Sequence, residues 1–493
     1  MKYFSTRGSA ERVSAAEAVI RGLAPDGGLY VPESFPELAL EDIAALVPLD
    51  YRARAARVMA PYLDEFSAAE VEELCAAAYG ANFDAPEIAP VRFTDENTGY
   101  LELWHGPTSA FKDMALQMLP RLLTASLKKR AVEKGVCILV ATSGDTGKAA
   151  LEGFADVPGT KIMVFYPRDG VSDVQRLQMV TQSGGNVGVC AVEGNFDDAQ
   201  TGVKRIFSDA ALAEELAARG WFLSSANSIN WGRLLPQIAY YFSAYCDAVS
   251  AGVVKLGEKL NFCVPTGNFG NILAGWMAKR MGLPAGRFIC ASNANNVLTD
   301  FINTGVYDRR REFHLTASPS MDILVSSNLE RLLYYLTGSS ESVAHWMRSL
   351  AETGVYDVGG ETVRRLQGEF SAGCCDDAEA AEEIERVWSG FGCLIDTHTA
   401  VASRVLGEYR RVSGDAAPAI VVSTASPYKF CDSVLAALGE DVSAPGFELL
   451  GRLEAVTGTS TPAPLASLAG KEPRFTACVA PEAMRKAVED FVG

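Results

Sequence analysis

Short, mostly apolar runs alternate with longer amphipathic stretches from about residue 136 onward. The runs are VCILVAT (136–142), KIMVFYP (161–167), NVGVCAV (186–192), WFLSSA (221–226), KLNFCVP (259–265) and AIVVSTASP (419–427). Runs of this length without polar alternation are typical of strands buried on both faces. Stretches with helical spacing separate them, and the stretch over 199–220 predicts one long helix. Strands that alternate with helices predict an α/β fold of parallel sheets covered on both faces.

The first 95 residues have a different pattern, with short helical stretches such as EDIAALVPL and AAEVEELCAAAYG and a tight turn at APDGG (24–28). They predict an accessory N-terminal domain without visible chemistry. A chain of 493 residues is longer than one compact core usually holds, so two or three domains are expected.

Composition and charge exclude several classes of function. The net charge is −17, so most of the surface repels nucleic-acid backbones and anionic membranes, and we expect neither as a partner. The 11 cysteines form no CxxC pair and no metal-ligand spacing with the four histidines, which indicates reduced thiols, no metal site and a cytoplasmic protein. The N-terminus lacks the apolar core of a signal peptide, and no run reaches the length of a membrane span.

Candidate chemistry lies in loops, because ligands of open parallel sheets bind beyond the carboxyl ends of the strands. HGPTSAFKD (105–113) places Lys112 at the start of the helical run MALQMLPRLL. A helix N-terminus in an apolar setting lowers the pKa of a lysine, which suits an amine that forms a Schiff base. An ordinary solvated lysine is the alternative.

Two further loops offer hydrogen-bond donors to anions. ATSGDTGK (141–148) follows a buried strand but is no nucleotide P-loop, because Thr142 and Ala149 stand where that motif needs Gly and Ser or Thr; a small carboxylate fits better. TGNFGN (266–271) predicts a compact phosphate cup, since its two glycines let backbone amides approach one anion. A plain strand-to-helix turn remains the alternative for each.

Two more segments complete the set. STASP (423–427) ends a strand with hydroxyls that can hydrogen-bond a neutral heterocyclic nitrogen, or form a simple Ser/Thr turn. NSINWGR (227–233) predicts a second anion site, in which Arg233 is the fork-shaped donor for phosphate. Two phosphate-sized cups and one carboxylate cup predict a phosphorylated cofactor and a phosphorylated, amino-acid-like substrate.

HGPTSAFKD, ATSGDTG, PTGNFGN and STASPYKF together resemble the threonine synthases, pyridoxal 5′-phosphate (PLP) enzymes of fold type II. MKYFSTRG, GLAPDGGLYVPE, NSINWGR and SPSMDILVSSNLERLLYYL resemble their longer form, so the resemblance covers Met1 to about Lys429. It implies a fold like that of the tryptophan synthase β chain, with two open parallel-sheet domains and a small N-terminal domain. Ser426 and Tyr428 depart from the family, in which many relatives have His and Ala.

The resemblance also implies roles for residues. Lys112 would carry PLP as a Schiff base and act as the catalytic proton shuttle, and Thr424 would contact the pyridine nitrogen. The cofactor phosphate would be held by Gly267, Asn268, Phe269 and Asn271. The substrate α-carboxylate would be bound by Ser143, Gly144, Asp145 and Thr146, and the substrate phosphate by Asn227, Ser228 and Arg233 with Thr146. His105 and His398 also match family positions, and for both we expect a structural role.

The implied activity is the conversion of O-phospho-L-homoserine and water to L-threonine and phosphate. Residues 1–95 would form the accessory domain, 96–119 with 259–493 the larger PLP-binding domain, and 120–258 a smaller domain that closes over substrate. Three alternatives stay open: a fold-type II dehydratase or sulfhydrylase, a relative that only removes phosphate from phosphohomoserine, and a non-catalytic binding protein. A dehydratase or sulfhydrylase needs no second phosphate cup, so the segment 227–233 argues against it.

Overall fold

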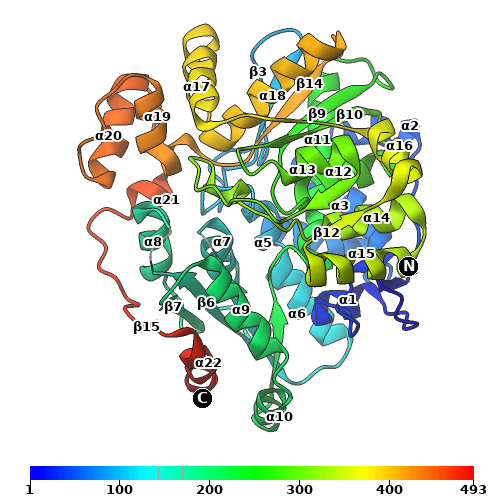
Figure 1. The fold of residues 1–493 in the computed structure, drawn as a ribbon, viewed down its shortest axis with the longest axis vertical. Coiled ribbons are helices and arrows are strands. Elements are labelled where there is room, and N and C mark those ends of the chain that lie inside the picture. The colour runs from blue at the N-terminus through cyan, green and yellow to red at the C-terminus, as the bar shows by residue number, and fades with distance from the viewer. Residues whose placement is uncertain (143, 169–170) are drawn as a thin grey trace.

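The computed structural model describes residues 1–142, 144–168 and 171–493. Two sheets with parallel strands form its body (Figure 1). The larger has the order β13-β10-β9-β14-β4-β3, and only its edge strand β3 is antiparallel to its neighbour. The smaller has the order β15-β7-β6-β5-β8 and is parallel throughout. The α/β architecture with two parallel sheets is therefore as predicted.

The strands coincide closely with the apolar runs of the sequence. Those of the larger sheet are β3 (Val91–Phe93), β4 (Thr98–Glu102), β9 (Leu260–Pro265), β10 (Ala285–Ser292), β13 (Phe370–Cys374) and β14 (Ala419–Ser423). Those of the smaller sheet are β5 (Gly135–Ala141), β6 (Thr160–Pro167), β7 (Val187–Val192), β8 (Trp221–Ser225) and β15 (Cys478–Val479). Every residue of β7, β9 and β14 is buried, as expected for strands covered on both faces.

Helices cover both sheets. Around the smaller sheet lie α7 (Asp145–Phe154), α8 (Asp173–Val180), α9 (Phe196–Phe207), α10 (Ala210–Ala218) and α22 (Met484–Val492). Elsewhere the structure has α5 (Asp113–Leu116), α6 (Leu119–Lys129), α11 (Trp231–Ser250), α12 (Gly270–Arg280), α13 (Val297–Thr304), α14 (Leu329–Thr337), α15 (Ser340–Thr353), α16 (Gly359–Glu369), α17 (Asp377–Phe391), α18 (Thr397–Ser413), α19 (Cys431–Ala437), α20 (Gly446–Thr457) and α21 (Ala463–Ala466). Short elements connect them: β11 (Val306–Asp308), which pairs with β12 (Val355–Asp357), and the 3-10 turns η2 (Pro319–Met321), η3 (Pro427–Phe430) and η4 (Pro481–Ala483).

One sequence prediction about a helix was wrong. The stretch 199–220 is not a single helix, because α9 ends at Phe207 and α10 begins at Ala210. The Asp209 side chain accepts a hydrogen bond from the amide of Leu212 at 3.0 Å and so caps the second helix. A short side chain that competes for backbone amides in this way favours a helix start over a helix interior.

The N-terminal residues pack closely against the larger sheet's helices. They contain the hairpin of β1 (Tyr3–Ser5) and β2 (Tyr30–Pro32), the helices α1 (Ala15–Arg21), α2 (Leu40–Leu46), α3 (Tyr51–Met59) and α4 (Ala68–Ala78), and the turn η1 (Ala60–Tyr62). The ring of Tyr3 lies 5.2 Å from that of the buried Trp231 on α11, and α3 packs along the same helix. One hydrophobic core thus runs from the N-terminal residues into the body of the protein.

The division into domains stays a prediction, but two elements lie outside the bounds that the sequence indicated. Helix α11 packs against α12 and α3, so residues 231–250 lie with the larger sheet although the predicted smaller domain ran to 258. At the other end of the chain, β15 pairs with β7 and α22 packs on α9, so the C-terminal residues return to the smaller sheet (Figure 1). Each element lies where its apolar surface is buried, whatever its position along the chain.

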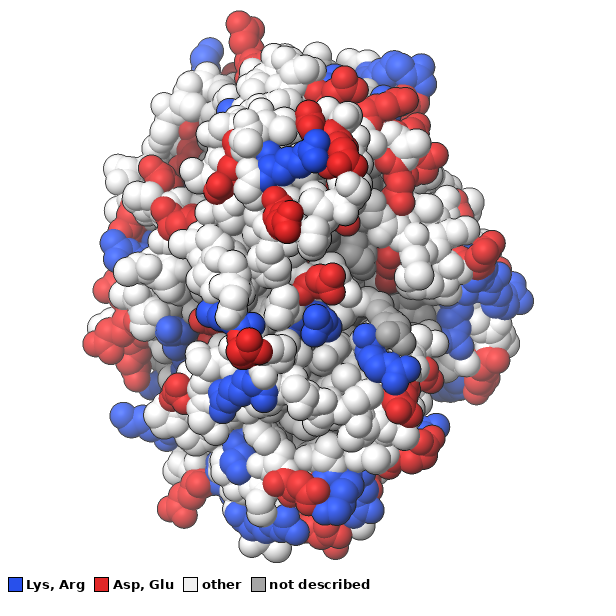
Figure 2. Space-filling model, turned by 90° about the vertical axis from the view of Figure 1, so that its left-hand side faces the viewer, with Lys and Arg blue, Asp and Glu red and all other residues white. Residues whose placement is uncertain are grey.

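The surface bears charges of both signs. On the face shown in Figure 2, acidic and basic side chains are interspersed, and the basic ones do not gather into one continuous patch. Across the described ranges, no helix is long and apolar enough to span a bilayer.

Candidate active site

Two segments more than 300 residues apart in sequence lie side by side at the end of strand β14. The amide of Phe111 donates to the carbonyl oxygen of Thr424 at 2.8 Å, and the amide of Ser426 donates to that of Ser109 at 3.0 Å. Ala110 and Ala425 form an antiparallel bridge between them. The fold therefore brings Lys112 next to the loop that contains Thr424, as the proposed roles of these two residues require.

Lys112 stands immediately before the short helix α5 and is largely withdrawn from solvent, with 11% of its side chain exposed. Its Nζ lies 3.2 Å from Ser320 Oγ and 3.5 Å from Asp145 Oδ2. Burial lowers the pKa of Lys112; Asp145 opposes this effect, and the positive charges of Lys429 and Arg233 add to it. The expected direction is thus found, but burial rather than the helix terminus is its main cause.

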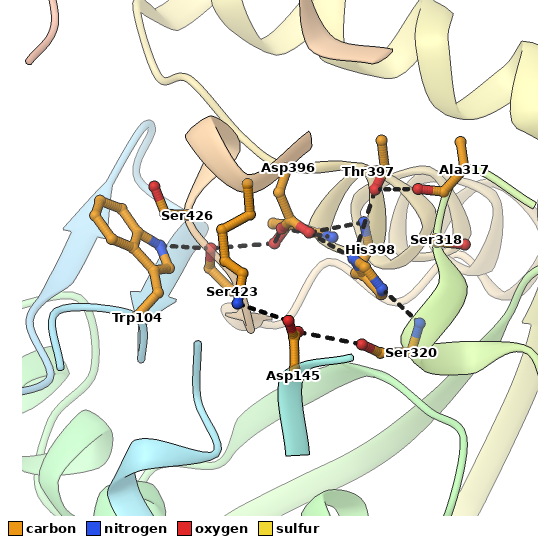
Figure 3. Close-up of polar contacts among 12 residues, drawn as sticks. Trp104, Asp145, Ala317, Ser318, Ser320, Asp396, Thr397, His398, Ser423 and Ser426 are labelled. Atoms are coloured by element: carbon orange, nitrogen blue, oxygen red, sulfur yellow. Dashed lines mark hydrogen bonds and ion pairs between the residues drawn. The ribbon is translucent and has the colours of Figure 1, made fainter. Parts of the chain in front are cut away.

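The carboxylate of Asp145 is the most heavily engaged group near Lys112. Its Oδ1 lies 2.6 Å from the Nζ of Lys429 and accepts a hydrogen bond from Gln175 Nε2 at 2.9 Å. Its Oδ2 faces Lys112 and accepts from Ser320 Oγ at 3.3 Å, a contact drawn in Figure 3. Although burial opposes ionisation, Lys429 and Lys112 hold the pKa of this carboxyl well below its usual range. A negatively charged side chain cannot bind a substrate carboxylate, so only the backbone of Asp145 suits that predicted role.

His398 fixes the position of the Ser320 segment. The amide of Ser320 donates to His398 Nε2 at 3.0 Å, and His398 Nδ1 lies 2.7 Å from Asp396 Oδ2 (Figure 3). Because Nε2 accepts a hydrogen bond, the ring proton lies on Nδ1 and is donated to Asp396. Thr397 Oγ1 adds a 2.7 Å hydrogen bond to the carbonyl oxygen of Ala317. The contacts of His398 are those of a residue that orients η2.

His105 has a comparable environment at the end of β4. Its Nδ1 lies 2.6 Å from Asp84 Oδ1 and its Nε2 lies 3.0 Å from Glu102 Oε2, while its ring stacks on Trp104. Although burial opposes the charged form, the two carboxylates raise the pKa of His105 to about 9. Both ring nitrogens are occupied, which agrees with the expected structural role.

The segment 266–271 forms an uncapped helix start, as a phosphate cup requires. Phe269 has a left-handed backbone with φ 60° and precedes α12, which has no side-chain cap at its N-terminus. The Oδ1 of Asn271 accepts hydrogen bonds from Tyr240 at 2.6 Å and Tyr241 at 2.7 Å. Its Nδ2 is buried and has no partner among the described residues. A Cβ on Gly267 would lie 2.9 Å from the Ser320 carbonyl oxygen, so glycine is needed there. Free helix amides and an unpaired amide donor fit a phosphate group.

The second predicted anion site, 227–233, contains a buried cation with no anionic partner. Only 3% of Arg233 is exposed, and its Nη1 donates to the carbonyl oxygen of Ala226 at 2.6 Å. Its Nε is buried without a partner, and no carboxylate within the described ranges is among the groups that act on its charge. Burial lowers its pKa to about 10, so the charge is costly in the absence of an anion. The buried Oδ1 of Asn227 likewise has no hydrogen-bond partner in the part of the chain that the structure describes.

The two anion sites adjoin each other. Ser228 Oγ lies 3.4 Å from Ser327 Oγ, which in turn lies 3.4 Å from Asn268 Oδ1. Arg331, which the sequence did not point to, stabilises both segments. Its Nη2 donates to the Ile229 carbonyl oxygen at 2.7 Å, and its other nitrogens donate to Asn328 Oδ1 and to the Tyr30 carbonyl oxygen. Its place in SPSMDILVSSNLERLLYYL was the available signal.

The loop before α7 is described only in part, because Ser143 lies outside the described residues. Gly144 has φ 146°, and a Cβ there would lie 2.6 Å from the Gln175 side chain. Thr142 Oγ1 accepts hydrogen bonds from the amides of Gly144 at 3.0 Å and Gly147 at 2.9 Å. Thr146 follows in the first turn of α7, next to the Asp145 backbone. This loop faces the Lys112 segment through Asp145.

Comparisons with known proteins agree with this geometry. Residues 101–425 match the family model of pyridoxal-phosphate-dependent enzymes, and residues 2–79 and 399–492 match the models of the threonine synthase N terminus and C-terminal region. The threonine synthase of Pseudomonas aeruginosa is 41% identical over 88% of this chain and 90% of its own. The chain belongs to the threonine synthase family. The resemblance seen in the sequence ended at about Lys429, and the C-terminal family model extends the similarity to residue 492.

Two further matches define the extent of the similarity. Human threonine synthase-like 1 is 43% identical over 87% of this chain, but the match spans only 59% of that longer protein. A crystal structure of PLP-bound threonine synthase from Brucella melitensis is 39% identical, covers 100% of this chain and 98% of its own, and superposes with a TM-score of 0.87. The fold-type II assignment is therefore confirmed, and the chain belongs to a family of pyridoxal-phosphate-dependent enzymes.

Proposed function

We propose that this threonine synthase family member converts O-phospho-L-homoserine and water to L-threonine and phosphate. The observation that carries the proposal is the buried, unneutralised guanidinium of Arg233 beside a phosphate-sized cup and close to Lys112. A buried charge without a partner is expensive, so its retention points to an anion that arrives with the ligand. A second anion site is what distinguishes a phosphorylated substrate from the unphosphorylated substrates of dehydratases.

The cofactor would lie between the two sheets. Lys112 Nζ would bond the cofactor aldehyde, Thr424 would contact the pyridine nitrogen, and Gly267, Asn268, Phe269 and Asn271 would hold the phosphate. The unpaired Nδ2 of Asn271 and the uncapped start of α12 support the last assignment. When bound, PLP withdraws electrons from the carbon atoms of the attached amino acid, which makes its protons removable.

The residues of this chain would then move protons and hold the leaving group. The Lys112 amine, whose lowered pKa favours its neutral form, would remove protons from Cα and Cβ of the substrate. Ser320 Oγ and Asp145 Oδ2, both within 3.5 Å of Nζ, would hold the protonated amine in place. Arg233, Asn227 and Ser228 would stabilise the phosphate as its bond to Cγ breaks. Protons would return to Cγ and, at the end, to Cα, which restores the two that Lys112 removed. Water would add its hydroxyl at Cβ, and its remaining proton would go to the released phosphate.

The substrate carboxylate would be held at the first turn of α7. The amides of Asp145 and Thr146 have no acceptor among the described residues, and a helix N-terminus favours an anion. We retain Ser143 and Gly144 in this proposal as part of the same loop. The side chain of Asp145 is excluded by its ion pair with Lys429.

A product assay tests the proposal directly. The PLP-loaded protein is incubated with O-phospho-L-homoserine, and threonine and inorganic phosphate are quantified in the same samples. Equal amounts of the two products are expected. Phosphate without threonine would support a phosphatase relative, and conversion of serine or threonine to a keto acid, with phosphohomoserine untouched, would support a dehydratase.

A further inference from the structure

A second buried lysine shares the Asp145 carboxylate with Lys112. The side chain of Lys429 is fully buried in η3, and its Nζ lies 2.6 Å from Asp145 Oδ1 and donates to the carbonyl oxygen of Thr108 at 3.1 Å. Lys112 faces the other oxygen of the same carboxylate at 3.5 Å. One carboxylate therefore lies between two ammonium groups, and neither the chemistry proposed above nor the anion sites uses Lys429.

We propose that Lys429 is a positioning residue that balances the charge of Asp145 and thereby sets how readily the nitrogen of Lys112 takes up a proton. This inference rests on the proposed role of Lys112 as the PLP lysine. It extends that role by naming the residue that controls the protonation of the Lys112 amine.

Lys429 acts on Lys112 electrostatically, through Asp145. A lone carboxylate within about 4–6 Å favours a protonated amine and raises its pKa by roughly 1–3. Asp145 is such a group, and it would make the released Lys112 amine a poor base at neutral pH. Lys429 Nζ lies 2.6 Å from the carboxylate of Asp145, closer than Lys112 Nζ at 3.5 Å. Lys429 therefore offsets the negative charge, and the nitrogen of Lys112 is next to a nearly neutral ion pair. Ordinary salt does not screen this pair, because both side chains are buried.

Among the described residues, three charged side chains act most strongly on Lys112. Asp145 lies on α7, Lys429 on η3 and Arg233 on α11, and η2 contributes the neutral hydroxyl of Ser320. Arg233 adds a second positive influence that is independent of Asp145. A change of charge at Lys429 should therefore shift the titration of Lys112 in one direction, with Arg233 constant.

The test is the pH titration of the visible band of the cofactor bound to Lys112. Lys429→Met leaves the Asp145 carboxylate uncompensated, so the pKa of this band should rise by about 1 or more. Lys429→Arg keeps the charge and should restore a value near that of the unaltered protein. In the double variant with Asp145→Asn and Lys429→Met, the carboxylate is gone and the rise should disappear.

Matched controls separate charge from packing. Lys148 is another buried lysine, on the same helix as Asp145, and its Nζ lies 2.8 Å from Glu152 Oε2. Lys148→Met should leave the pKa of the cofactor band unchanged. An unchanged pKa in folded, PLP-loaded Lys429→Met, or a rise that persists in the double variant, would overturn the inference. If Lys429→Met does not fold, the Lys429→Arg and Asp145→Asn proteins provide the test. Asp145→Asn must lower the pKa of the band, because Lys429 then acts on Lys112 without the carboxylate, and Lys429→Arg must leave it nearly unchanged. Borohydride labelling of a lysine other than Lys112 would instead refute the proposed function.

Discussion

Removal of the Arg233 guanidinium is the sharpest test of substrate identity. Two quantities set the expected loss of activity. Burial lowers the pKa of Arg233 from its ordinary 12.5 to about 10, which corresponds to about 3 kcal/mol of unfavourable charge burial in the absence of an anion. A charge-assisted contact with a phosphate is typically worth about 1.5–3 kcal/mol. Arg233→Ala should therefore lower kcat/KM for phosphohomoserine by roughly one to two orders of magnitude, since each 1.36 kcal/mol is about tenfold.

The assay compares kcat/KM, the visible cofactor band and thermal stability. The band should survive in Arg233→Ala, because the cofactor phosphate lies in the other cup. Thermal stability without ligand should not fall, since a costly buried charge is removed, whereas inorganic phosphate should stabilise only the unaltered protein. Arg233→Lys should recover part of the activity, because an ammonium keeps the charge but not the fork.

A buried arginine that has a carboxylate partner provides the control. Arg54 is 6% exposed and its Nη1 lies 2.6 Å from Asp247 Oδ1 on the same helix α11. Arg54→Ala should lower stability and leave kcat/KM unchanged. If Arg233→Ala behaves like Arg54→Ala, with unchanged kcat/KM in a folded, PLP-loaded protein, the reasoning for a phosphorylated substrate fails.

Three further predictions concern the cofactor, the smaller sheet and stability. Lys112→Ala should lose the visible Schiff-base band and the single borohydride-labelled peptide; a coloured variant protein labelled elsewhere would contradict the assignment. The smaller sheet with its C-terminal additions, about 135–225 and 478–492, should rotate toward the larger sheet when a phosphonate analogue of the substrate binds, and identical orientations in free and bound crystals would count against closure. The pKa of His105 is raised to about 9 in the fold, above its ordinary 6.5, so its contribution to stability is complete below pH 6.5 and is lost as pH rises through 9. The free energy of unfolding should fall by roughly 1–3 kcal/mol across that range, and His105→Gln, compared by chemical denaturation, should show a much flatter profile.

The sequence determined the elements and the chemistry that are local. Buried strands such as β9 and β14 were evident because apolar residues dominate them, and the loops after them were evident because Gly, Ser, Thr and Asn cluster where a strand ends. Local side-chain competition could still mislead, as the capping Asp209 divides a stretch that looked like one helix. The direction of the Lys112 pKa shift was likewise predictable from an apolar setting.

Tertiary structure alone decided which charges meet. Lys429 and Asp145 are 284 positions apart, and no pattern in either segment shows that a 2.6 Å ion pair joins them. The same holds for Arg331, whose guanidinium reaches carbonyl oxygens from the N-terminal hairpin and the Ser228 loop. Periodicity reports which face of an element is buried, but the partners of a buried polar group are set by how the elements pack, and only the fold fixes that packing.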